Sequence, residues 1–180
     1  MKWVGRAARL VVAVGILLCA IAIALTVFGQ IITVPPLLLG ALWLFVAGVF
    51  TVTLLALILL GGLRSRNIVR SAASVLARRE LVAAAVLAAG FWVAAGFGFA
   101  GASGGQPVST PECPTALDDH GTITCVSQEV FHQAVAAQQL IIAGAFGWFL
   151  VFELLGNIIV SRLASPRPRS EPTQAQAHSR

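Results

Sequence analysis

The stretch LVVAVGILLCAIAIALTVF, residues 10–28, contains no Asp, Glu, Lys or Arg over 19 residues. A helix of about 20 apolar residues spans the hydrocarbon core of a bilayer. A helix is expected because lipid offers no partner to an unpaired backbone amide. The stretch also exceeds the roughly 7–15 apolar residues of a cleaved signal peptide. It therefore predicts a transmembrane helix that stays part of the protein.

Three further apolar runs follow, at residues 37–63, 81–101 and 136–160. The chain of 180 residues is 58% hydrophobic and only 11% charged, whereas a soluble domain carries about 25% charged residues. We therefore predict an all-α integral membrane protein, a bundle of four transmembrane helices within one domain over residues 1–160. Glycines in these runs are expected to allow close helix packing, as small residues do in membranes: Gly40 with Gly48, Gly90 with Ala94, and Gly144 with Gly147.

The basic residues predict the orientation of this bundle. All twelve Lys and Arg lie before the first run, between the second and third, or after the fourth, and none lies in Gly29–Pro36 or 102–133. Cytoplasmic loops carry the excess of Lys and Arg, so both termini are expected in the cytoplasm and the loop 102–133 outside. Eleven of the twelve are Arg, and Ala is abundant, which is typical of a G+C-rich bacterium. The expected location is the bacterial plasma membrane.

The connector 64–80 is expected to form a cytoplasmic amphipathic helix with a basic face, suited to an anionic lipid surface. Its basic residues are Arg64, Arg66, Arg70, Arg78 and Arg79. It either anchors the topology or docks a cytoplasmic partner. Nucleic acid is not an expected partner, because no aromatic residues interleave with these arginines. The basic tail 161–180 lacks apolar periodicity and is expected to be disordered.

The predicted outer loop contains Cys113 and Cys125, which enclose eleven residues. Disulfides persist in oxidising compartments, so we expect these two cysteines to form a disulfide that closes a compact hairpin or short loop. A zinc site is the alternative by residue type, with His120 as third ligand and Asp118, Asp119 or His132 as fourth, but the spacing contains no CxxC or HxxxH. No metal and no cofactor are therefore predicted.

A redox role is a further alternative for the same cysteine pair. The layout resembles that of the quinone-linked disulfide-forming membrane oxidases, which also have four spans and an outer cysteine pair between the third and fourth. Those enzymes need a further CxxC pair in the first outer loop. Gly29–Pro36 contains no cysteine, so the quinone-linked pair is absent and no redox activity is predicted.

Glu153 is the one acidic residue inside the predicted spans. It lies about 10 Å below the inner end of the fourth run at 1.5 Å per residue, where a carboxylate is costly unless it is paired, protonated or hydrated. Asn157 lies one turn away on the same face, and Thr51 and Thr53 of the second run reach a similar depth. Glu153 and Asn157 are thus either an interhelical hydrogen-bonding group or a proton or cation site.

No arrangement of residues for catalysis is evident in the sequence. The favoured hypothesis is a non-catalytic membrane protein, an accessory subunit, assembly factor or scaffold with protein partners in the bilayer. The alternative is a small transporter or proton-coupled carrier that uses Glu153. The sequence leaves the partner, the substrate and the oligomeric state open.

Overall fold

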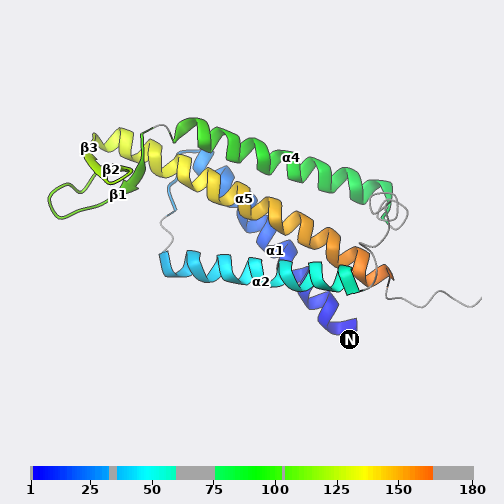
Figure 1. Cartoon of the computed structure of the whole chain (residues 1–180). Coiled ribbons are helices and arrows are strands. Elements are labelled where there is room, and N and C mark those ends of the chain that lie inside the picture. Colours follow the sequence, from blue (N-terminus) through cyan, green and yellow to red (C-terminus); the bar gives the residue numbers. More distant parts are fainter. Residues whose placement is uncertain (1, 33–35, 60–75, 103, 164–180) are drawn as a thin grey trace, which may run out of the picture.

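A computed structural model describes residues 2–32, 36–59, 76–102 and 104–163 of the chain (Figure 1). The described part is mostly helical, with a small antiparallel sheet between the last two helices. The helices are α1 (Lys2–Val27), α2 (Pro36–Leu59), α4 (Arg78–Gly101) and α5 (Gln128–Leu163).

Three helical stretches are long and apolar enough to cross a membrane: Ala7–Val27, Arg78–Gly101 and Gln128–Arg162. Helix α2 has no charged residue, and its described apolar stretch is Gly40–Ala56. These helices form because unbroken apolar sequence in lipid satisfies its backbone groups only within a helix. The prediction of a multi-pass membrane protein is supported to this extent.

Helix α5 organises the described bundle. It packs against α4, α1 and α2, and every extensive contact between described helices involves α5. Figure 1 shows α5 running through the middle of the molecule, with α4 on one side and α2 on the other. The buried core follows this arrangement, since Phe146, Leu150 and Val151 of α5 form one cluster with Val12 of α1 and Phe91 of α4.

Close approach of α4 and α5 depends on glycines. A Cβ atom added to Gly144 would lie 2.7 Å from the carbonyl oxygen of Phe91, and one added to Gly98 would lie 2.6 Å from that of Ala137. Gly147 faces the Phe91 ring directly. The prediction for Gly144 and Gly147 is therefore confirmed. Within the described part of the chain the same prediction is wrong for Gly40, Gly48 and Gly90, because a Cβ at any of them would meet no described atom within 4 Å.

The segment between α4 and α5 forms a three-stranded antiparallel sheet in the order β1-β2-β3. Its strands are β1 (Gln106–Val108), β2 (Ala116–Asp119) and β3 (Thr122–Cys125). The chain reverses between β2 and β3 at His120 and Gly121, with φ of 52° and 91°, which suits a two-residue hairpin turn. The backbone N–H of Gly121 donates to Asp118 Oδ1 at 2.7 Å. The expected hairpin is present, but β1 makes it a sheet, so the fold is mostly helical rather than all-α.

Cys113 and Cys125 form the predicted disulfide, with their Cα atoms 5.9 Å apart. The bond ties the segment before β2 to the end of β3. Thr115 supports the same junction, since its hydroxyl donates to the carbonyl oxygen of Val126 at 2.8 Å. The small sheet is therefore held both by its strand pairing and by a covalent link.

Several predicted boundaries differ from those of the helices. Helix α5 begins at Gln128 rather than at residue 136, and it continues to Leu163, so residues 161–163 of the predicted tail are helical. Helix α4 begins at Arg78 rather than at residue 81, because Glu80 caps its first turn. The predicted connector helix lies mostly outside the described residues, and so do Arg64, Arg66 and Arg70 and the tail after residue 163.

Candidate functional site

Glu153 lies on the face of α5 that meets α2, and it is only 2% exposed. The hydroxyl of Thr53 in α2 donates a hydrogen bond to Glu153 Oε1. Thr53 is itself buried. This contact joins α2 to α5 through two residues that are 100 positions apart in sequence. It agrees with the prediction that Thr53 lies at a depth similar to that of Glu153.

Asn157 completes this polar group from within α5. Its Nδ2 donates to Glu153 Oε1 at 2.6 Å and to the Glu153 backbone oxygen at 3.2 Å. The spacing of four residues places both side chains on one helix face. Thr51, the other expected neighbour, does not contribute, because its hydroxyl donates to the carbonyl oxygen of Ala47 in its own helix.

The two oxygens of the Glu153 carboxyl have different surroundings. Oε1 accepts from both Thr53 and Asn157, whereas Oε2 is buried and has no hydrogen-bond partner among the described residues. A buried polar atom without a partner costs free energy. A proton at Oε2 would neutralise the buried charge, and a small cation there would give the oxygen a partner. The group can therefore either join α2 to α5 or hold such an ion.

Aromatic side chains surround the α2–α5 contact. The rings of Trp43 and Phe146 lie 4.3 Å apart, and Phe50 meets Phe149 edge to face at 5.8 Å. Phe146 is 2% exposed. The polar group at Glu153 therefore belongs to an interface that is otherwise apolar.

A second polar contact joins α1 to α5 near the end of the bundle that carries the sheet. The hydroxyl of Thr26 lies 3.2 Å from Gln139 Oε1, and Gln139 Nε2 donates to the carbonyl oxygen of Ile32. Thr26 is buried at 7% exposure. A single Thr in an apolar run offers no sign in the sequence that it would be the partner of Gln139.

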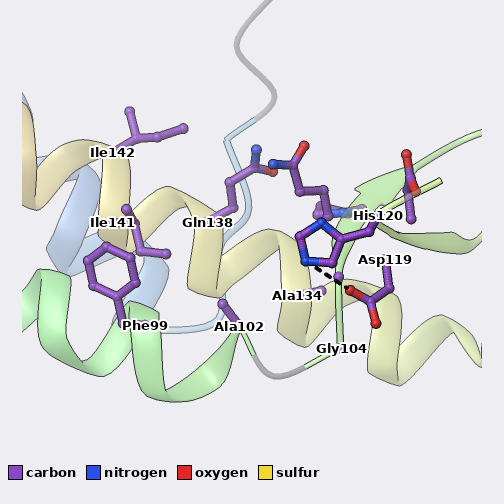
Figure 2. Close-up of a pocket in the computed structure, with 13 residues that line it drawn as sticks. Phe99, Ala102, Gly104, Asp119, His120, Ala134, Gln138, Ile141 and Ile142 are labelled. Atoms are coloured by element: carbon purple, nitrogen blue, oxygen red, sulfur yellow. Dashed lines mark ion pairs between the residues drawn. The ribbon is translucent and has the colours of Figure 1, made fainter. Parts of the chain in front are cut away.

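A pocket of about 680 Å³ lies between the sheet, the end of α4 and α5. Figure 2 shows Phe99 and Ile141 on one side of it and Asp119 and His120 on the other. His120 Nε2 lies 3.8 Å from Asp119 Oδ1. The sequence suggested these polar residues only as alternative metal ligands. Among the residues with described positions, no three His, Cys, Asp or Glu side chains come together as a metal site would require.

The structure thus brings Glu153 and Asn157 together with Thr53, and it places the Cys113–Cys125 pair apart from them, at the sheet. Arg78 and Arg79 lie in the first turn of α4. The chain matches no protein-family model, no curated protein and no solved structure.

Proposed function

We propose that this chain is a non-catalytic multi-pass membrane protein that serves a larger membrane complex as an accessory subunit, assembly factor or scaffold. It would lie in the bacterial plasma membrane with four spans and both termini in the cytoplasm. The length of α2 supports a total of four spans, because its 24 residues at 1.5 Å each cover about 36 Å, enough to cross the hydrocarbon core. The absence of Lys and Arg from 102–133 supports the orientation.

The observation that carries the proposal is the open arrangement around α5. In a closed four-helix bundle each helix packs against neighbours on two sides. Here α1, α2 and α4 each pack extensively on α5, and no extensive contact joins any two of these three in the described chain. We infer that helices of another subunit pack against α1, α2 and α4 beside α5.

Exposed apolar side chains line the same helices. On α1, Leu17 and Leu18 are 59% and 60% exposed, and on α4, Trp92 and Phe97 are 61% and 70% exposed. Lipid covers such side chains equally well, so they support the proposal only together with the open arrangement. Large aromatic side chains are favoured at the centre of protein interfaces, which makes the Trp92 face of α4 the preferred contact.

Purification in a mild detergent from the native membrane, followed by mass spectrometry of the co-eluting proteins, tests the proposal. A partner in stoichiometric amount is the expected result, and Trp92→Ala should weaken its retention. The matched control is Val86→Ala, because the Val86 side chain lies on the same helix and is 66% exposed. Elution of the chain alone, as a monomer or a homo-oligomer, would overturn the proposal.

The second candidate is a small transporter or proton-coupled carrier that uses Glu153. The buried and unpartnered Oε2 atom favours it, because an exchangeable proton or cation is one way to satisfy that atom. The variant Glu153→Gln separates the candidates. A transporter would lose a proton or cation flux in proteoliposomes while its assembly stayed intact, whereas a subunit would show no flux before or after the change.

A further inference from the structure

The pocket beside the sheet has two chemically different parts. Its apolar part is formed by Phe99 and Ala102 near the end of α4 and by Ala134, Ile141 and Ile142 of α5. Its polar part is formed by Asp118, Asp119 and His120 at the β2–β3 turn. Gln138 lies between the two parts in Figure 2.

The apolar part continues the surface that would face lipid. Phe99 is 66% exposed and lies in the last turn of α4, a helix long and apolar enough to cross a membrane. Ile141 and Ile142 lie on the neighbouring stretch of α5, in a second such helix. A hydrocarbon chain can therefore enter the pocket sideways from the bilayer without crossing water.

The polar part contains two aspartates and no Lys or Arg. Its one histidine, His120, is fully exposed, with Nε2 3.8 Å from Asp119 Oδ1. The segment 102–133 contains four acidic residues and no Lys or Arg. Two of the four, Asp118 and Asp119, line the pocket. Asp118 is also held in place, since its Oδ1 accepts from the backbone N–H of Gly121 at 2.7 Å. The charge at this edge of the pocket suits a cation and disfavours the phosphate or carboxylate of an anionic lipid.

The backbone forms one wall of the pocket at Gly104 and Gly105. Gly105 has φ of 103°, and a Cβ atom there would lie 2.6 Å from the carbonyl oxygen of Asp118. At these glycines the chain, which leads from α4 to β1, passes close to the backbone of β2. The volume of about 680 Å³ lies within the roughly 300–1,000 Å³ of common ligand pockets.

We propose that this pocket binds one membrane lipid whose headgroup carries a positively charged amine. The amine lies beside Asp118 and Asp119, and the hydrocarbon chain lies along Phe99, Ile141 and Ile142. This site is separate from the Glu153 group, because neither Glu153 nor its partners Thr53 and Asn157 line the pocket. It gives the disulfide-linked sheet a role, because the sheet supplies the acidic residues.

Photo-crosslinking in phosphatidylcholine nanodiscs tests the proposal. The probe is octadecylamine with a diazirine in its chain, and the comparison probe is octadecanoic acid with the same diazirine. After irradiation, mass spectrometry locates the adducts on the full-length protein. We expect adducts on the peptides that contain Phe99 and Ile141, with a yield for the amine about fivefold above that for the acid.

Charge variants test which residues select the amine. Asp118→Asn with Asp119→Asn should remove the preference for the amine. Glu112→Gln with Glu129→Gln is the matched control, because it removes the same charge from the same segment at exposed positions that do not line the pocket. The control variant should keep the preference. Circular dichroism and an intact-mass measurement of the disulfide establish that each variant is folded.

A blocking variant keeps the test decisive if the charge variant does not fold. Gln138→Trp replaces an exposed side chain that lines the pocket, and it should reduce the adducts of both probes there. Equal labelling by the two probes in the wild-type protein would overturn the proposal. So would adducts that lie away from the pocket, or an amine preference that survives the loss of both aspartates.

Discussion

Glu80 and Arg162, which are 82 residues apart, form a two-pronged salt bridge between the start of α4 and the end of α5. The guanidinium Nη2 donates to Glu80 Oε1 at 2.6 Å, and Nη1 donates to Oε2 at 2.8 Å. Glu80 Oε2 also accepts from the backbone N–H of Ala77 at 2.8 Å, so one carboxylate caps α4 and ties it to α5. No sequence pattern indicated this pair.

Glu80→Gln tests the contribution of the salt bridge. Glutamine keeps a side-chain oxygen for the Ala77 amide but loses the charge that pairs with Arg162. We expect faster amide hydrogen exchange in the first turn of α4 and the last turn of α5. The unfolding midpoint should hardly change, because exposed ion pairs contribute little to stability.

Hydrogen-exchange mass spectrometry in nanodiscs measures this effect. Glu112→Gln is the control, since Glu112 is exposed and lies far along the chain from both helix ends. The double variant with Arg162→Gln should exchange no faster than the more affected single variant. Additive effects of the two changes would contradict a direct coupling between these residues.

Thr53→Val should weaken the contact between α2 and α5. Valine has a similar shape but cannot donate to Glu153 Oε1, so the free energy of unfolding is expected to fall by about 1 kcal/mol. Titration with a denaturing detergent, followed by circular dichroism, measures this change. Thr51→Val is the matched control, because Thr51 is exposed and its hydroxyl donates to the carbonyl oxygen of Ala47 in the same helix. Equal losses in the two variants would show that the Thr53–Glu153 bond has no special role.

Gly144→Ala should separate α4 from α5. The added methyl group would meet the Phe91 carbonyl oxygen at 2.7 Å and the Ala95 backbone nitrogen at 2.9 Å, and backbone atoms cannot move aside as a side chain can. A loss of about 1–3 kcal/mol in the free energy of unfolding is expected from such overpacking. The same detergent titration measures it.

Gly90→Ala is the control for this substitution. Gly90 lies on α4, where an added Cβ meets no atom of the described chain within 4 Å, so the change should leave stability unaltered or slightly raise it. A comparable loss in both variants would mean that glycine acts through the helix itself and not through the contact between helices.

The disulfide determines how many thiols can react with maleimide before and after reduction. Without reductant, unfolded protein should bind one maleimide, at Cys19, because Cys113 and Cys125 are bonded to each other. After reduction it should bind three. Replacing both bonded cysteines by Ser should destabilise the sheet by about 3 kcal/mol and speed its amide exchange. Three reactive thiols before reduction would contradict the bond.

The features of the fold and of the candidate site that could be predicted are those that depend on local sequence. The apolar runs indicated the helices, and the four-residue spacing of Glu153 and Asn157 indicated their shared face. Cys113 and Cys125 could be paired because no other cysteine lies in that segment. These features need no knowledge of which helices are neighbours.

The features that were missed depend on contacts between distant parts of the chain. Strand β1 is three residues long and contains Pro107, so it has no strand pattern and forms only by pairing with β2. The early start of α5 was missed because the segment from Gln128 to Gln133 is too polar for an apolar run. Hydropathy detects the part of a helix that lies in lipid, whereas the helix itself continues beyond it.

The central position of α5 also determines when this protein can fold. During translation, residues 128–163 leave the ribosome after the other described helices, yet these helices need α5 for their extensive contacts. In the proposed four-span topology, the first three helices would be inserted as separate segments and would assemble only once α5 arrives. A nascent chain that stops before Gln128 would then hold three inserted helices without their shared partner.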